Sequence, residues 1–296
     1  MYQALPPRAR FGAHMQTTGG LHNALHAGKA VGCDIVQIFT KSPQQWKTKE
    51  LTDEAVEQFL QAQEETGIPC LASHDSYLIN PCAPGEELLE KSRAALADEL
   101  IRSSRLRIPF VVMHQGSLVG APEHEALARL IDSVKYALDR APEDGSMLLL
   151  ETTAGQGQCL GHRFEQVAAV LEGVESHYGH EARRRLGVCL DTCHVFAAGY
   201  DLRTPEAYAA TMEEFDRRIG LDRVRFIHAN DSKKELGSRV DRHAAIGEGH
   251  IGVEAFRLLL TDPRLAGAPV ALETPKEGDM DPVNLAALRK AAGLDA

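Results

Sequence analysis

The stretch MLLLETT at residues 147–153 decides the fold class, because an unbroken apolar run passes directly into a carboxylate and two hydroxyl side chains. A run this short and apolar is typical of a strand buried on both faces of a parallel sheet. Residues 162–178 follow with apolar side chains at helical spacing, and a second apolar run, LGVCLDTCH, occupies 186–194. These stretches predict a β-strand, an α-helix and a second strand parallel to the first.

The same alternation extends in both directions along the chain. The other apolar runs are FGAH (11–14), DIVQIFT (34–40), PCLASHDS (69–76), IPFVVMHQGS (108–117), VRFIHAND (224–231) and APVALETP (268–275). The other stretches with helical spacing are 19–31, 52–66, 86–105, 122–140, 204–219, 252–261 and 282–292. Helix starts are marked by Thr52 with Glu54 in the first turn, and by Pro122 and Pro205 at the first helical position.

Eight strands that alternate with eight helices predict a single α/β domain over residues 1–296, a (β/α)8 TIM barrel. A doubly wound open sheet is the alternative. The pair Gly155 and Gly157 resembles a dinucleotide-binding loop, but Gly161 comes too late to supply the third glycine, so this interpretation is weak.

The composition is that of a globular protein, with 44% hydrophobic and 25% charged residues. No run approaches the ~18 apolar residues of a membrane span, so we expect no membrane association. The opening stretch MYQALPPRAR has no apolar core of a secretory signal. The six cysteines include no Cys-x-x-Cys pair and are interpreted as buried, reduced thiols. We therefore expect a cytoplasmic protein.

The net charge of −10 argues at first against a nucleic-acid partner, because DNA-binding proteins usually carry a basic surface. Bound divalent metal ions would reverse this balance locally, since they can be the largest charges in a site. The basic cluster Arg183, Arg184 and Arg185 precedes the strand at 186–194 and is interpreted as a solvated surface at the other end of the barrel.

Ionisable side chains end most of the apolar runs: His14, His74, His114, Glu151, Asp191, His194, His228 and Glu273. The carboxyl ends of barrel strands open onto one face, where barrel enzymes carry out their chemistry, so these side chains should converge. Asp241 and His243, in the loop after 224–231, should join them as a pair. A single such residue is more often a cap or a hydrogen-bonded group. Metal coordination, however, would satisfy all of them together, and unpaired buried charges would be costly.

The residue types predict the kind of metal. Imidazole nitrogens mixed with carboxylate oxygens, without cysteine, suit zinc, manganese or iron rather than calcium. The role of His14 is left open, and the predicted ligands are His74, His114, Glu151, Asp191, His194, His228, Asp241, His243 and Glu273. These fit about three ions with one bridging carboxylate, with a two-metal site as the alternative. We expect the strand at 186–194 to end near Cys193, which would let His194 turn toward Asp241 and His243.

These positions lie in motifs that resemble the endonuclease IV family of zinc-dependent apurinic/apyrimidinic endonucleases. The motifs are GAHMQTTGGL (12–21), FTKSPQQW (39–46), SHDSYLIN (73–80), HQGS (114–117), ETTAGQGQCLG (151–161), DTCHVFAAGYD (191–201), HANDSK (228–233), SRVDRHAAIGEGHIG (238–252) and LETP (272–275). All nine predicted ligands coincide with metal ligands of that family.

The resemblance implies how the ligands are shared among three zinc ions. His74 and His114 would hold one ion, with Glu151 bridging to a second. The second ion would also take Asp191, His228 and Glu273, and the third would take His194, Asp241 and His243. Manganese or iron could replace zinc.

The resemblance also implies a DNA-repair reaction on damaged double-stranded DNA. Family members incise 5′ to an abasic site, leave a 3′-hydroxyl and a 5′-deoxyribose phosphate, and remove 3′-blocking groups. A hydroxide that bridges metal ions would attack the phosphate, with Glu151 and Glu273 as catalytic residues and Glu273 as a general base. Because monomers are typical of the family, the resemblance also predicts a monomer.

Duplex opening would use side chains that insert into the base stack. Motif position assigns this role to Tyr77 and Leu78, with ordinary loop packing as the alternative. Gln44 stands where family members carry a basic residue, and this departure puts one inserted contact in doubt. The rival function is a metal-dependent sugar isomerase or epimerase on the same barrel, which would need fewer ligands. A third option is a DNA-binding module without activity.

Overall fold

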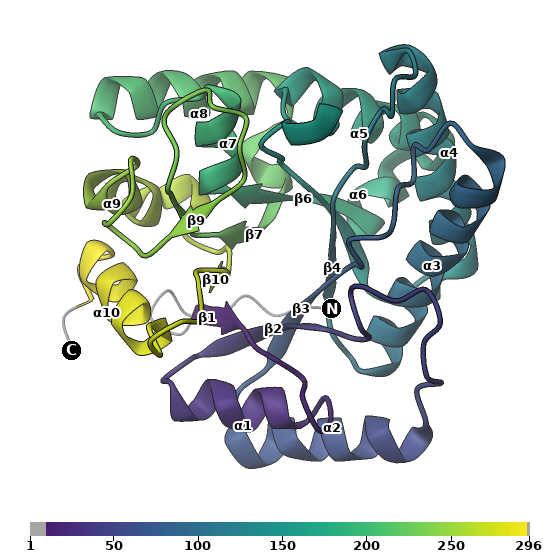
Figure 1. The fold of residues 1–296 in the computed structure, drawn as a ribbon, viewed down its shortest axis with the longest axis horizontal. Coiled ribbons are helices and arrows are strands. Elements are labelled where there is room, and N and C mark those ends of the chain that lie inside the picture. Colours follow the sequence, from purple (N-terminus) through teal and green to yellow (C-terminus); the bar gives the residue numbers. More distant parts are fainter. Residues whose placement is uncertain (1–9, 295–296) are drawn as a thin grey trace.

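The computed structural model describes residues 10–294 (Figure 1). Its main sheet is a closed barrel of parallel strands in the order β1-β10-β7-β6-β5-β4-β3-β2. The barrel prediction is therefore confirmed, and the open doubly wound sheet is wrong. Residues 1–9, which carry most of the stretch expected to lack a secretory signal, lie outside the described residues, as do 295–296. Within residues 10–294, no helix has the length and apolar character needed to cross a membrane.

Each barrel strand begins within two residues of the first residue of a predicted apolar run. The strands are β1 (Phe11–His14), β2 (Ile35–Phe39), β3 (Cys70–His74), β4 (Phe110–Met113), β5 (Met147–Glu151), β6 (Leu186–Asp191), β7 (Val224–His228) and β10 (Val270–Leu272). Apart from FGAH (11–14), which coincides with β1, the predicted runs extend further at their carboxyl ends, because they include the polar residues that follow the strands.

The helices that surround the barrel are close to the predicted stretches (Figure 1). They are α1 (Asn23–Ala30), α2 (Asp53–Thr66), α3 (Glu86–Arg105), α4 (Glu123–Arg140), α5 (Phe164–Tyr178), α8 (Pro205–Arg218), α9 (Val253–Thr261) and α10 (Asp281–Ala291). Thr52 caps α2 by accepting a hydrogen bond from the backbone N–H of Ala55. Pro205 begins α8 as predicted. Pro122 has an extended backbone and precedes the first turn of α4, so its predicted first helical position is wrong.

A short helix, a small two-stranded sheet and a second short helix were not predicted. The helix α7 (Thr192–Ala198) follows β6 directly, and β8 (Asp231–Ser232) pairs antiparallel with β9 (His243–Ala244). The expected end of the strand near Cys193 is wrong, because the Asp191 carboxylate accepts the backbone N–H of His194 and caps α7. The basic cluster forms the second short helix, α6 (Ala182–Arg185), ahead of β6. There Arg183 pairs with Asp222 at 3.1 Å, as expected of a solvated surface.

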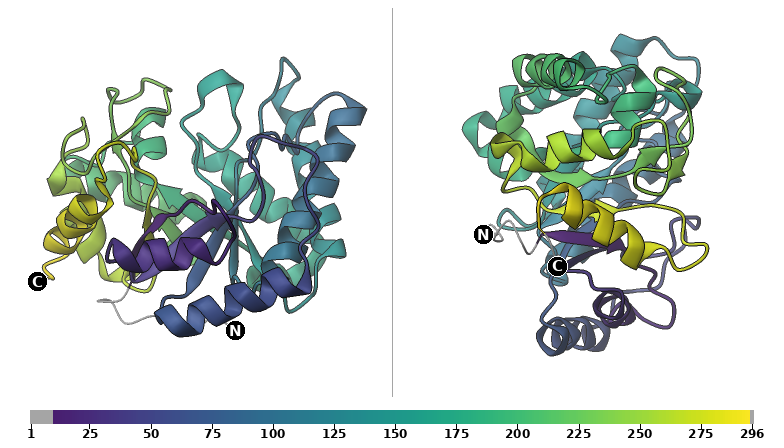
Figure 2. Two further views of the ribbon diagram at one scale, coloured as in Figure 1. Left: turned by 60° about the horizontal axis from the view of Figure 1, so that its bottom comes forward. Right: turned by 90° about the vertical axis from the view of Figure 1, so that its left-hand side faces the viewer.

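The barrel interior is filled by a compact apolar cluster. Its members are Ile35, Leu71, Ala72, Phe110, Val112, Leu149, Cys189, Phe226 and Ala271. A larger cluster packs between the strands and the outer helices. Figure 2 shows the long loops that follow the strands gathered at one end of the barrel, at the top of its left-hand view. Because side chains fill the barrel itself, polar groups at the strand ends are presented to that loop-covered end.

Candidate metal centre

The period of the β-strand places the polar side chains of the site above the apolar cluster. Side chains two positions apart on a strand point to the same side. Leu149, Cys189 and Phe226 lie in the interior cluster, and each is followed two positions later by an ionisable side chain. Glu151, Asp191 and His228 arise in this way, as do Gln37 after Ile35, His74 after Ala72, His114 after Val112 and Glu273 after Ala271. The fold therefore brings together residues that are far apart in sequence.

Glu151 occupies the centre of this arrangement. Its Oε2 lies 3.0 Å from His74 Nε2 and 3.1 Å from His114 Nε2. Its Oε1 lies 2.8 Å from His228 Nδ1 and 3.3 Å from His194 Nδ1. Burial opposes ionisation of Glu151, yet the surrounding imidazoles, His228 and His114 above all, hold its pKa well below the usual range. The carboxylate is therefore ionised and faces both sides of the cluster.

Three groups of side chains bring their ligand atoms within 4.8 Å of one another. The first group is His74, His114 and Glu151, the second is Glu151, Asp191, His228 and Glu273, and the third is His194, Asp241 and His243. In the second group, His228 Nδ1 lies 3.3 Å from Glu273 Oε2 and 3.8 Å from Asp191 Oδ2. All nine predicted ligands are thus brought together, in the grouping that the family resemblance implied.

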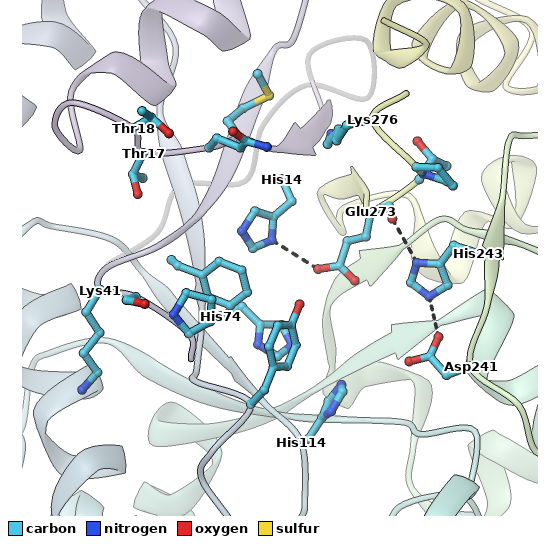
Figure 3. A pocket seen from close by; sticks show the side chains of 18 of the residues that line it. His14, Thr17, Thr18, Lys41, His74, His114, Asp241, His243, Glu273 and Lys276 are labelled. Carbon is cyan, nitrogen blue, oxygen red and sulfur yellow. Dashed lines mark hydrogen bonds and ion pairs between the residues drawn. The ribbon is translucent and has the colours of Figure 1, made fainter. Parts of the chain in front are cut away.

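The third group is assembled by the elements that the sequence pattern did not predict. Helix α7 carries His194 and strand β9 carries His243, and Asp241 lies between them. Asp241 Oδ2 is 3.2 Å from His194 Nε2. Its Oδ1 is 3.1 Å from His243 Nε2, a contact drawn in Figure 3. His194 reaches the pair through the first turn of a helix and not through a bend at the end of a strand.

Cys193 also approaches this region, although cysteine was left out of the predicted ligand set. Its Sγ lies within 4.8 Å of ligand atoms of Asp191 and His243. Burial raises the pKa of the Cys193 thiol to about 12. In the metal-free protein the thiol is therefore protonated at neutral pH.

The side chains fit a cluster of divalent cations. His243 Nε2 is buried and makes no hydrogen bond of acceptable geometry with the described residues, although a carboxylate oxygen is close to it. Burial lowers the pKa of His74, but the hydrogen bond with Glu151 and the charges of Glu151, Glu273 and Asp75 together outweigh burial and raise the pKa to about 10. The pKa of His243 is raised to about 9 in the same way by Asp241 and Asp191. The buried carboxylates thus stabilise positive charge at the site, and metal ions bound by the imidazoles and carboxylates would supply such charge.

Hydrogen bonds hold the ligand side chains in orientation. His74, His194 and His243 each direct Nδ1 at a backbone carbonyl oxygen: that of Asp75 at 2.9 Å, Thr152 at 2.8 Å and Glu273 at 3.0 Å. Their Nε2 atoms are left to face the cluster. Such partners fix the ring orientation of metal-binding histidines.

Two buried amide side chains that contact the predicted ligands, those of Asn230 and Gln37, were not identified from the sequence. The amide of Asn230 donates to Asp191 Oδ2 at 2.7 Å and accepts the backbone N–H of Glu273 at 2.8 Å. Its position two residues after His228 was the available signal. Gln37 contacts Glu273, His228 and also His14, whose Nδ1 lies 3.3 Å from Glu273 Oε1. His14, whose role the sequence left open, is therefore a neighbour of the cluster.

Part of the cluster lines an open cavity of about 660 Å³ (Figure 3): His74, His114, His194, Asp241, His243 and Glu273. Glu151, Asp191 and His228 are fully buried and do not line it. Tyr77 lines it, is 63% exposed and meets the ring of Phe39 edge-on at 5.4 Å between centroids. Lys276 supplies a basic group to the wall, whereas the ammonium of Lys41 is turned to Asp98 and Glu99 and its side chain is only 7% exposed. Leu78 is half-buried and Gln44 is exposed in the loop after β2, and neither lines the cavity.

Comparisons with known proteins add independent findings. The family described as xylose isomerase-like TIM barrel matches residues 25–293. A protein of Chloroflexus aurantiacus named probable endonuclease 4 is 51% identical over 282 residues, which are 95% of this chain and 97% of that protein. A namesake from Chloroflexus aggregans is 50% identical over 289 residues, 97% of this chain and 99% of that protein.

Solved structures agree with these sequence comparisons. The crystal structure of endonuclease IV from Thermus thermophilus matches with a TM-score of 0.83 and 38% identity, and the match covers 97% of this chain and 100% of that one. A D-tagatose 3-epimerase-like protein matches with a TM-score of 0.70 at 19% identity, over 96% of both chains. At that identity the second likeness concerns the fold alone.

Proposed function

The chain belongs to the endonuclease IV family, and on this premise we propose that it incises duplex DNA on the 5′ side of abasic sites. The products would be a 3′-hydroxyl and a 5′-deoxyribose phosphate, and the same site would remove 3′-blocking groups. The observation that carries the proposal is the central position of Glu151, whose carboxylate contacts four imidazoles, three of which line an open cavity.

We propose that the three groups hold about three zinc ions, with Glu151 shared between the first and second. Bound there, the ions would polarise phosphate oxygens and lower the pKa of a water molecule. This positive charge would lie where a DNA phosphate enters, which reconciles DNA binding with the net charge of −10.

Glu273 is the carboxylate best placed to act on the attacking water. It lines the cavity, and its side chain is 18% exposed, whereas that of Glu151 is fully buried. The neighbouring imidazoles, His228 above all, overcome its burial and keep the pKa of Glu273 far below its usual range. An ionised Glu273 would orient the water by accepting its hydrogen bond.

Duplex opening would depend on the rim of the cavity. The exposed ring of Tyr77 is supported from the side by Phe39 and would stack in the space left by a displaced nucleotide. Leu78 and Gln44 would assist from the adjoining loops. Lys276, whose side chain is 35% exposed, would face the phosphate backbone, although it also pairs with Asp281 at 2.8 Å. We further expect a monomer that works in the cytoplasm.

The alternative, a sugar isomerase or epimerase, shares the barrel and the gathering of histidines and carboxylates. It is less well supported, because one or two metals would leave the third group without a role. The two histidines of this third group are carried by α7 and β9.

The test is incubation of zinc-loaded protein with a duplex that carries one tetrahydrofuran abasic analogue, beside an identical undamaged duplex. We expect one incision, 5′ to the analogue, and an intact control strand. Ketose sugars are assayed in parallel. Turnover of a ketose without incision would establish the alternative and overturn the proposal.

A further inference from the structure

Gln37 is a buried polar side chain directly beneath the metal centre. It lies in the middle of β2 and has no solvent exposure. A side-chain amide offers two N–H donors and one carbonyl acceptor, and each needs a partner when it is buried. The partners of Gln37 are all ionisable side chains of the site: His228, Glu273 and His14.

The contacts determine which way the amide is oriented. Gln37 Nε2 donates to Glu273 Oε1 at 2.7 Å and to His14 Nδ1 at 2.9 Å, while Oε1 lies 2.8 Å from His228 Nε2. The flipped amide would place its oxygen 2.7 Å from a carboxylate oxygen, where two acceptors repel. The observed orientation is therefore the one that the hydrogen bonds allow.

This orientation fixes the tautomer of His228. The carbonyl oxygen of Gln37 can only accept, so His228 Nε2 must carry the proton. The nitrogen left to bind a metal ion is Nδ1, which already faces Glu151 Oε1 at 2.8 Å and Glu273 Oε2 at 3.3 Å. The same amide holds Glu273 by Oε1 and leaves Oε2 turned toward the second group.

His228 differs in this respect from three other histidines of the cluster. His74, His194 and His243 are oriented by backbone carbonyl oxygens, which no side-chain substitution removes. His228 is oriented by a side chain, so one substitution can remove the hydrogen bond that orients it.

We propose that Gln37 is a positioning residue of the metal centre, whose amide sets the tautomer of His228 and the orientation of Glu273. The inference rests on the proposed function, because it requires the second group to bind a metal ion. Removal of residues that orient metal ligands costs about 10- to 100-fold in metal affinity. We expect a loss of this size when the amide of Gln37 is removed.

The test compares Gln37→Met with Gln166→Met. Methionine keeps the length of glutamine without its hydrogen bonds. Gln166 is similarly buried in α5, where it accepts the backbone N–H of Gly161 at 3.0 Å and donates to Glu123 at 3.0 Å. Each protein is depleted with a chelator and reloaded with zinc in a competition titration. Cobalt(II) absorption reports the coordination in parallel.

We expect Gln37→Met to lower the affinity for one zinc ion by about 10- to 100-fold and to change the cobalt spectrum. The zinc affinity and cobalt spectrum of Gln166→Met should stay close to those of the wild type. Equal zinc affinity in Gln37→Met and wild type would overturn the proposal, as would equal losses in both variants. A wild-type protein that binds no zinc would instead sink the proposed function itself. If Gln37→Met does not fold, ¹⁵N spectra of the zinc-loaded wild type decide, because the proposal requires His228 to be protonated at Nε2.

Discussion

Glu151 Oε1 lies 2.8 Å from Nδ1 of His228, and neither side chain is exposed to solvent. Oε2 of the same carboxylate faces His74 and His114. Glu151 thus connects the first and second groups through its two oxygen atoms. A buried charge that loses its partner is expensive, so the two groups depend on each other through this one side chain.

We predict that Glu151→Gln abolishes incision while the barrel stays folded. The amide keeps the shape of the side chain but replaces one of the two oxygen atoms that face the imidazoles. Because loss of residues that merely support metal ligands already costs about 10- to 100-fold, we expect activity to fall by more than about 100-fold. Incision of the abasic duplex and far-ultraviolet circular dichroism measure the two effects.

A matched substitution is Glu87→Gln on α3, where the side chain is 86% exposed and pairs with Lys91. It should leave incision at the wild-type level. Near wild-type activity in Glu151→Gln would show that the shared-ligand assignment is wrong.

The metal-free protein should become less stable as the pH rises from neutral to about 10. The pKa of His74 is raised to about 10 and that of His243 to about 9, so the folded state binds protons that the unfolded chain, with ordinary histidines, releases near pH 6.5. Their contribution is fully present below pH ~6.5 and is lost as the pH approaches 9 to 10.

Thermal unfolding in chelator, between pH 6 and 10, measures this effect. The zinc-loaded protein is the comparison, since metal ions replace these protons and should raise and flatten the profile. A melting temperature of the metal-free protein that rises over the same range would contradict the prediction.

The sequence pattern predicted most residues of this centre, because the ends of strands and the types of the residues there are local features. The period of two that places Glu151 above Leu149 also places Gln37 above Ile35, so Gln37 could have been found. It was missed because glutamine is a less conspicuous candidate than histidine or glutamate.

Helix α7 was a different matter. The run LGVCLDTCH predicts a continuing strand from its composition, and the early end depends on the Asp191 carboxylate that accepts the N–H of His194. The bond between Gln37 Oε1 and His228 Nε2 joins residues 191 positions apart. Neither the hydrogen bond of a cap nor a distant contact of this kind can be read from local periodicity.

The third group should lose its metal ion independently of the other two. It shares no residue with the first or second group. We predict that His243→Ala lowers the zinc content from about three ions per chain to about two, because it leaves only His194 and Asp241 in that group. Elemental analysis of the dialysed protein measures this directly, and loss of every ion would show that the groups are not separate.

Tyr77→Ala should separate DNA opening from catalysis. The ring is 63% exposed and meets Phe39 edge-on and His74 at a tilt, so its removal should change the free energy of unfolding by less than about 1 kcal/mol. Stacking of an aromatic ring against bases contributes about 1–3 kcal/mol, so KM for an abasic duplex should rise about 5- to 150-fold. Steady-state incision and chemical denaturation measure the two quantities.

The matched substitution is Tyr136→Ala on α4, a tyrosine on the outer helical layer that stacks with Arg140. It should leave KM unchanged, and an equal rise in KM in both variants would assign Tyr77 to loop packing.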